Sequence, residues 1–362
     1  MFAYWLLFGF PALMALVHGL RGTGPEGVWG RVGRRIKPLW WLFALLVVLA
    51  VGYRFRVGCD WGTYLKTFDF MAYATIPDAL ARTDPAYALI NWATNRLGWG
   101  IGGTNLVCAI VFAFGLFRYC ARQPSPWLTV MAAVPYLIIV VAMGYTRQAA
   151  ALGVLLLAYN AFVDRRLLLF LGFVAGAALF HRSAVVLAPL AIFIPTQVPL
   201  WRIIFSALAT FILVRYVAND AIDRYVYGYI ESEYEGGAGA FFRLPLNVLA
   251  AVVFLANRKK WGMRYNDGRL MMALSLVSMA LLPLSYFYPV AADRIGLYVL
   301  IIQVTVFTRL PDLYRSFFHP VLATVVVVLA YAASHYVWLN YANHARCWVP
   351  YQSSLLKDLR IY

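Results

Sequence analysis

The stretch WLTVMAAVPYLIIVVAMGYTRQAAALGVLLLAYNAFV, residues 127–163, decides the fold of this protein. Its only charged residue is Arg147, which together with Thr146 and Gln148 separates two long apolar runs. A helix needs ~20 apolar residues to cross a bilayer, and each run approaches that length. The stretch therefore predicts two consecutive membrane helices with almost no loop between them and an arginine at their junction.

Apolar runs of the same kind fill the rest of the chain. Hydrophobic residues make up 63% of the sequence and charged residues only 13%, which is too little polar surface for a soluble domain. We therefore expect an all-α, polytopic integral membrane bundle, a single domain over residues 1–362, with about 11 to 12 transmembrane segments. The predicted segments are Tyr4–Leu20, Leu39–Tyr53, Gly103–Phe117, Trp127–Tyr145, Ala149–Val163, Leu167–Phe180, Ala184–Ile194, Ile203–Val217, Leu246–Ala256, Leu270–Val290, Ile295–Phe307 and Val321–Leu339.

The shortest neighbouring pair of runs meets at His181-Arg182-Ser183. This pair is either a broken or re-entrant segment or one long helix. Irregular backbone at membrane depth is tolerated where it lines a cavity, so a break here would indicate a site. A histidine beside an arginine at such a break favours function, because a neutral imidazole accepts a hydroxyl proton near pH 7.

The distribution of Lys and Arg favours an arrangement with both termini outside. The connections expected inside hold more than half of the basic residues and few acids, most clearly at Arg34-Arg35 and Arg258-Lys259-Lys260. Positive charge marks the cytoplasmic side. Two long connections, 54–102 and 218–243, then lie outside, over the expected site. The expected inner connections are 21–38, 118–126, 164–166, 195–202, 257–269 and 308–320.

Several protein classes lack support in the sequence. The net charge of +16 does not indicate a nucleic-acid partner, because the basic residues lie in short connections where they set topology. Walker, GxSxG and HExxH motifs are absent, so ATP-driven transport and common hydrolase chemistry are not indicated. The four cysteines include no CxxC pair, and spacing alone leaves open whether Cys59 and Cys347, both on the expected outer face, are bonded. The alternating acids Glu231, Glu233 and Glu235 indicate a cation site only weakly, and we predict no metal.

Ionisable residues interrupt or flank the apolar runs, and the expected topology places them all on the outer side. Such groups near a membrane are costly and mark functional sites by default. Their arginines predict an outward-facing site for an anionic substrate, because a guanidinium matches phosphate and carboxylate geometry. These residues are Arg56, Asp60, Asp84, Arg147, His181, Arg182, Asp293 and Arg294.

The same residues also have purely structural interpretations. Arg56 and Asp60 would close a juxtamembrane turn as an ion pair. Arg147 would extend from a helix end to the interface. Asp293 and Arg294 would form an interface anchor with a local ion pair.

Short motifs follow one another in a characteristic order between the apolar runs. They are Arg56-x-Gly58-x-Asp60-x3-Tyr64, Asp84-Pro85-x-Tyr87, Arg147-Gln148, Phe180-His181-x-Ser183-Ala184, Arg294-x3-Tyr298 and Pro350-Tyr351. This order resembles the EpsG family of Wzy-like polysaccharide polymerases, from about Tyr53 to Tyr351. One departure is Asp84, where the family is expected to carry a glutamate, so that the charge is kept.

The resemblance implies a GT-C-like architecture in the bacterial cytoplasmic membrane, with the active site facing the exterior. It also implies that two undecaprenyl-diphosphate-linked glycans react there. A hydroxyl of the acceptor attacks the anomeric carbon of the donor and lipid diphosphate leaves, with inversion and without a cofactor. A diphosphate leaving group needs arginines, and the hydroxyl needs a base. Besides these glycans and the lipid bilayer, the expected partners are a chain-length regulator and a flippase.

The implied roles fall on the motif residues. Asp60 or His181 is the expected base. The diphosphate is assigned to Arg56, Arg147 and Arg294, with Arg182 as a weaker fourth contact. Five further motif residues would orient the ligand or these side chains, and they are Tyr64, Asp84, Gln148, Ser183 and Tyr298.

Other functional classes stay open. An O-antigen ligase would share the donor and the outer face but use another acceptor, which the sequence does not identify. A transporter or flippase would place charges at the middle of the bilayer within inverted repeats, whereas the charges here gather at the outer ends and no repeat is found. A purely structural scaffold would not need so many outward arginines.

Overall fold

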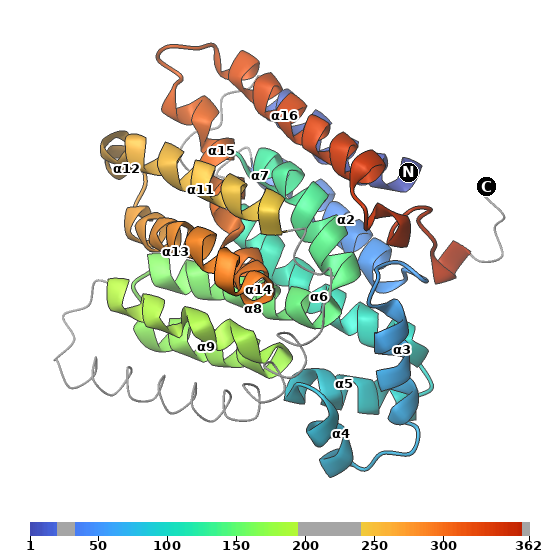
Figure 1. Ribbon diagram of the computed structural model, residues 1–362. Coiled ribbons are helices and arrows are strands. Elements are labelled where there is room, and N and C mark those ends of the chain that lie inside the picture. Colours follow the sequence, from blue (N-terminus) through green and yellow to red (C-terminus); the bar gives the residue numbers. More distant parts are fainter. Residues whose placement is uncertain (20–32, 195–239, 357–362) are drawn as a thin grey trace. The chain divides into compact units, whose positions relative to one another are not determined.

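The computed structural model describes residues 1–19, 33–194 and 240–356, and within these ranges every regular element is a helix (Figure 1). Within these ranges, β-type pairing is limited to an isolated bridge between Arg54 and Ser353. This confirms the predicted all-α class of a polytopic helical membrane protein. The predicted segment Ile203–Val217 and the acids at 231, 233 and 235 lie outside the described residues.

The described chain divides into two compact units. The first consists of Met1–Leu156, Leu179–His181 and Thr308–Tyr362, and the second of Leu157–Ala178 and Arg182–Phe307. The helices that begin in the first unit, in chain order, are α1 (Phe2–Gly19), α2 (Gly33–Gly52), α3 (Trp61–Phe70), α4 (Ile76–Arg82), α5 (Pro85–Arg96), α6 (Gly100–Cys120), α7 (Pro126–Ala133), the π-helix η2 (Val134–Ala142), α8 (Thr146–Val163), α16 (Pro320–Tyr341), η5 (Ala345–Cys347) and η6 (Ser354–Leu356). Those that begin in the second unit are α9 (Leu167–Phe180), η3 (Arg182–Phe193), α11 (Ala240–Ala256), α12 (Arg258–Arg264), α13 (Gly268–Phe287), α14 (Pro289–Val299) and α15 (Ile301–Leu313).

Three described helices, α6, α13 and α16, are long and apolar enough to cross a membrane by length and composition. The pair α14 and α15 makes a fourth span if its two helices, bent by 41°, count as one. The shorter apolar helices, of 10–17 residues, coincide with other predicted runs, such as Pro126–Ala142 and Leu167–Phe180. Apolar runs thus predicted where helices form, because a chain in lipid must satisfy its backbone hydrogen bonds internally.

The sequence left open whether the two runs that meet at His181 form a broken pair or one long helix, and the structure shows a break. The α-helix α9 ends at Phe180, and a 3₁₀-helix, η3, begins at Arg182. The two predicted runs are therefore not one continuous α-helix. His181 and Arg182 also fall on opposite sides of the division between the two units.

The first long connection is itself helical, since residues 54–102 contain α3, α4 and α5. A capping box between Thr75 and Asp78 begins α4. Pro85 opens α5, where a proline costs nothing because the first helical N–H groups have no partner inside the helix. In the second long connection, residues 218–239 lie outside the described residues, and 240–243 begin α11.

Small residues allow close helix contact in the first unit. A side chain on Gly115 of α6 would collide with the carbonyl oxygen of Gly153 on α8, so the two backbones touch there. Close approach through small residues is a common way to pack membrane helices. Elsewhere in the unit, Trp40 of α2 packs edge-on against Phe117 of α6 and Trp127 of α7. These contacts pack α8, which carries Arg147, against α6, and α2 against α6 and α7.

Candidate active site

The loop between α2 and α3 presents Arg56 in a constrained conformation. Arg56 has φ +52°, in the left-handed region that bulky residues rarely adopt. On one side the Phe55 N–H donates to Gln352 O at 2.9 Å, and on the other the Gly58 N–H donates to Cys347 O at 2.8 Å. Gly58 has φ +96°, and a Cβ there would lie 2.7 Å from Met143 O. Backbone outliers of this kind cluster at functional sites.

The side chain of Arg56 is exposed and forms no ion pair with any described residue. Its guanidinium carbon lies 5.2 Å from the centre of the Phe55 ring. The structural alternative of a turn closed by an Arg56–Asp60 ion pair is therefore not what the structure shows. Asp60 is half-buried at the start of α3, where its side chain makes no capping bond. Arg56 is thus an accessible cation on a fixed backbone.

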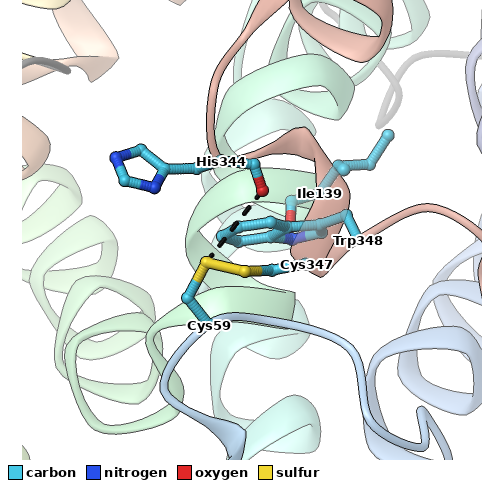
Figure 2. The surroundings of a disulfide bond; sticks show 5 residues. All are labelled: Cys59, Ile139, His344, Cys347 and Trp348. Atoms are coloured by element: carbon cyan, nitrogen blue, oxygen red, sulfur yellow. Dashed lines mark hydrogen bonds between the residues drawn. A yellow bond between two sulfur atoms is a disulfide. The ribbon is translucent and has the colours of Figure 1, made fainter.

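A disulfide between Cys59 and Cys347 ties this loop to residues 344–354, which we call the C-terminal strap (Figure 2). The two Cα atoms are 5.1 Å apart although the cysteines are 288 residues apart in sequence. The strap is also anchored by Trp348, whose indole N–H donates to Ile139 O at 2.9 Å. The same indole packs so closely on Gly144 that a Cβ there would collide with it. The question that the sequence left open, whether the two cysteines pair, is answered by the structure.

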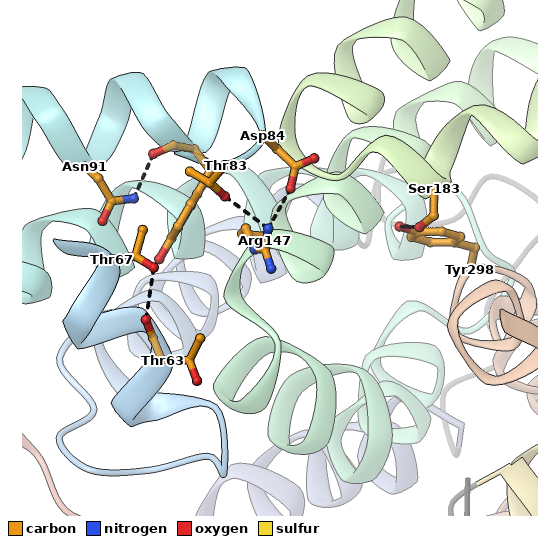
Figure 3. A network of polar contacts seen from close by, with 9 residues as sticks. Thr63, Thr67, Thr83, Asp84, Asn91, Arg147, Ser183 and Tyr298 are labelled. Atoms are coloured by element: carbon orange, nitrogen blue, oxygen red, sulfur yellow. Dashed lines mark hydrogen bonds and ion pairs between the residues drawn. The ribbon is translucent and has the colours of Figure 1, made fainter. Parts of the chain in front are cut away.

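Arg147 and Asp84 meet as an ion pair (Figure 3). Nη1 of Arg147 donates to Asp84 Oδ2 at 2.8 Å and to Thr83 Oγ1 at 3.0 Å. Asp84 stands at the N-cap of α5 but makes no capping bond. The Asp84 side chain is 3% exposed, whereas that of Arg147 is 34% exposed. Asp84 therefore holds one arm of the guanidinium fork and leaves part of Arg147 accessible.

Aromatic side chains surround this ion pair. The Arg147 guanidinium lies 6.0 Å from the centre of the Tyr87 ring, and the Tyr87 and Tyr64 rings are 5.9 Å apart in an edge-on arrangement. Phe180 packs against the cluster that contains both tyrosines. His181 directly follows Phe180 in the chain and is buried, with 8% of its surface exposed. Gln148, beside Arg147, is buried.

The other predicted residues belong to the second unit. The hydroxyl groups of Ser183, at the start of η3, and Tyr298, on α14, are 3.0 Å apart (Figure 3). Tyr298 is fully buried, and its backbone oxygen accepts a hydrogen bond from Tyr159 at 3.0 Å. Arg182 and Arg294 are partly exposed. The second unit thus brings together Ser183 and Tyr298 of the predicted set.

The buried arginines that sequence reasoning missed include Arg243 and Arg54. Arg243 of α11 pairs with Asp293 of α14 at 2.5 Å, so Asp293 has a partner on another helix and not only its neighbour Arg294. Arg54, two residues before Arg56, is 2% exposed. Neither arginine stood out in the sequence, because each lies at the edge of an apolar run, where a helix-end arginine is unremarkable. In the described part of the chain no group of three or more His, Cys, Asp or Glu residues is placed to hold a metal ion.

Comparison with known proteins gives one match. No curated protein and no solved structure matches the chain. The family model that matches covers residues 37–353, which include the Arg56 loop, Arg147, the His181 break, α14 and most of the C-terminal strap. Because this match covers most of the sequence, the chain belongs to the EpsG family, whose members have a polysaccharide polymerase-like function.

Proposed function

We propose that this protein is a glycosyltransferase that polymerises undecaprenyl-diphosphate-linked repeat units on the outer face of the bacterial cytoplasmic membrane. The acceptor hydroxyl loses its proton to a base and attacks the anomeric carbon of the donor. The bond from that carbon to the diphosphate oxygen breaks, and lipid diphosphate leaves with the bonding electrons. One glycosidic bond replaces one glycosyl-phosphate bond, so the transfer needs no nucleotide sugar.

The observation that carries this proposal is the exposure of the Arg56 side chain on a constrained backbone. Its guanidinium is exposed, has no acid partner among the described residues, and projects from a backbone held on both sides by the strap. A cation kept accessible at the cost of an unfavourable φ is suited to an anionic ligand. Arg147, held by Asp84 with a third of its side chain accessible, is suited to the same anion. Charge on a leaving diphosphate would be stabilised by these fixed donors.

The other roles follow from chemistry and from the family. From the family resemblance, Arg294 is also assigned to the diphosphate, with Arg182 as a weaker contact. Tyr64, Gln148, Ser183 and Tyr298 would orient the ligand or the arginines, and Asp84 would orient Arg147. Asp60 or His181 would take the acceptor proton. Arginines supply the counter-charge in this scheme, and it requires no metal.

The cysteines support an outward orientation of the site. Disulfides form and persist in oxidising compartments and are rare in the cytosol. The Cys59–Cys347 disulfide lies on the Arg56 loop, whereas Cys108 and Cys120 are free and buried. A loop closed by this bond is therefore expected on the exterior side of the membrane. A chain-length regulator and a flippase that delivers the lipid-linked units are the expected neighbours.

The decisive experiment is an assay of the purified protein with a lipid-linked repeat unit, without nucleotide. A ladder of products is the expected result, and Arg147→Ala and His181→Ala should both shorten it strongly. Transfer to a second acceptor without a ladder would identify a ligase instead. Transport across vesicles without a new linkage would identify a flippase. If both variants make full-length polymer at normal expression, the assignment of the site is wrong.

A further inference from the structure

Arg54 is a buried arginine at the start of the loop that carries Arg56. The residue is 2% exposed. Its Nη1 donates to Val51 O at 2.6 Å. Its Nη2 donates to Thr146 Oγ1 at 2.6 Å and to Asn105 Oδ1 at 3.3 Å. All three acceptors are neutral, so these bonds fix the guanidinium without balancing its charge.

The charge of Arg54 has no counter-charge in direct contact. Arg54 forms no ion pair with a carboxylate in the part of the chain that the structure describes, and its buried Nε–H has no hydrogen-bond partner. A guanidinium stays protonated in proteins. Burial of an unbalanced cation is costly, and an apolar residue of similar volume would avoid that cost. Packing alone therefore does not explain an arginine here.

The contacts of Arg54 join the two segments that carry Arg56 and Arg147, the accessible arginines assigned to the candidate site in the first unit. Arg54 lies two residues before Arg56, and its backbone pairs with Ser353 of the C-terminal strap. Thr146, which accepts from its Nη2, is the first residue of α8 and directly precedes Arg147. The buried cation thus sits where the Arg56 loop meets the start of α8.

We propose that Arg54 is a positioning residue of this site, which holds the Arg56 loop to the start of α8 and strengthens the attraction of the site for diphosphate. The inference rests on the proposed function. The missing counter-charge is then the diphosphate, whose oxygens contact Arg56 and Arg147. A buried charge is screened less than a surface charge, so Arg54 acts on the anion without touching it.

The test is Arg54→Met, which keeps the volume and removes the charge, in the full-length protein in nanodiscs of neutral lipid. Calorimetry measures the binding of inorganic pyrophosphate and of farnesyl diphosphate, and the Tm of each variant is recorded alongside. We expect about ten-fold weaker binding of both probes, from the loss of one buried charge near the anion. The Tm should stay unchanged or rise, because the removed charge was unbalanced. Arg54→Lys, which keeps the charge, should retain most of the affinity.

Arg309→Met is the matched control. Arg309 is also a buried arginine of the first unit, 5% exposed, and its Nη2 donates to Gln123 at 2.7 Å. Gln123 follows the C-terminal end of α6, whereas Asn105, the partner of Arg54, lies near the N-terminal end of that helix. The control variant should bind both probes as the wild type does.

The outcomes separate the inference from the proposed function. Wild-type affinity in Arg54→Met, while Arg147→Ala abolishes binding, would overturn the inference alone. A fall in Tm that accompanies the loss of binding in both Arg54→Met and Arg54→Gln would assign Arg54 to the fold and would also overturn it. If the wild type binds neither probe, the diphosphate site itself is wrong and the proposed function fails with it.

Discussion

At the scale of single residues, the arginines of the first unit differ in whether an acid accompanies them. Arg147 shares one arm of its fork with Asp84, whereas Arg56 and Arg54 have no such partner among the described residues. Arg56 is exposed and Arg54 is buried. Arg147 is therefore oriented by an acid, Arg56 is accessible to a ligand, and Arg54 is proposed to act from within the protein.

Asp84→Asn should weaken catalysis by orienting Arg147 less firmly. A hydrogen bond between charged groups contributes ~1.5–3 kcal/mol, so we expect polymerisation to slow by roughly ten- to a hundred-fold. Asp84→Glu, the residue expected in the family, should keep more activity than Asn. The measurement is the rate of ladder formation together with polymer length in cells that lack the native enzyme.

The control for this variant is Asp78→Asn. Asp78 is exposed on α4, and its side chain bonds with Thr75 of the same helix cap, so Asp78→Asn should leave polymerisation near normal. A wild-type rate for Asp84→Asn would mean that Arg147 is not held by Asp84 during the reaction.

The base can be identified from Asp60→Asn and His181→Gln. Loss of a general base typically slows a reaction by about 10²–10⁴-fold. The acid limb of the wild-type pH–rate profile reports the protonation of the base. The variant that loses the base should lose that limb of the pH–rate profile. If both variants keep more than a tenth of the wild-type rate, neither Asp60 nor His181 is the base.

At the scale of elements, the loop between α2 and α3 depends on a strap from the other end of the chain. Carbonyl oxygens of the strap accept hydrogen bonds from the Phe55 and Gly58 N–H groups. The disulfide between Cys59 and Cys347 links the same two segments covalently. Trp348 connects the strap to η2, the π-helix that leads toward α8. Stretches of π-helix are rare in proteins, and those that occur are often found at functional sites. The strap therefore links the two segments that present Arg56 and Arg147.

Cys59→Ser should loosen this loop without unfolding the membrane helices. A native disulfide contributes about 2–4 kcal/mol, so we expect a lower Tm and a several-fold lower rate of polymerisation. Treatment of the wild type with a reductant should have the same effect. Cys120→Ala, which changes a buried free cysteine, serves as the control and should respond to reductant as the wild type does. Equal Tm and rate with and without the bond would show that backbone contacts alone hold the strap.

At the scale of the whole molecule, the membrane topology remains a prediction from charge. Single cysteines tested in a background without Cys108 and Cys120 can check it. Tyr73, 92% exposed after α3, is expected outside, and the exposed Lys259 of α12 is expected inside. An impermeant maleimide should label Tyr73→Cys in intact cells and Lys259→Cys only after permeabilisation. Labelling of Lys259→Cys in intact cells would mean that the chain crosses the membrane a different number of times between α3 and α12 than predicted.

The sequence by itself determined where helices form. Apolar runs such as 127–145 and 149–163 became α7 with η2, and α8, because lipid allows only a backbone that satisfies its own hydrogen bonds. The family was also readable from the order of motifs. The interruption at His181-Arg182-Ser183 was readable as a candidate break, and the structure decided against the alternative of one long helix. Local pattern and motif order sufficed for the helices and the family.

Only the tertiary structure decided which distant side chains meet. Cys59 finds Cys347, Arg147 finds Asp84, and Arg54 is buried against Thr146. Each of these pairings depends on how helices pack, through contacts such as Gly115 against Gly153, and packing leaves no periodic signal in the sequence. The burial of Arg54 could not be predicted for the same reason. The local sequence around an arginine at a helix end does not show whether the side chain lies in water or inside the protein.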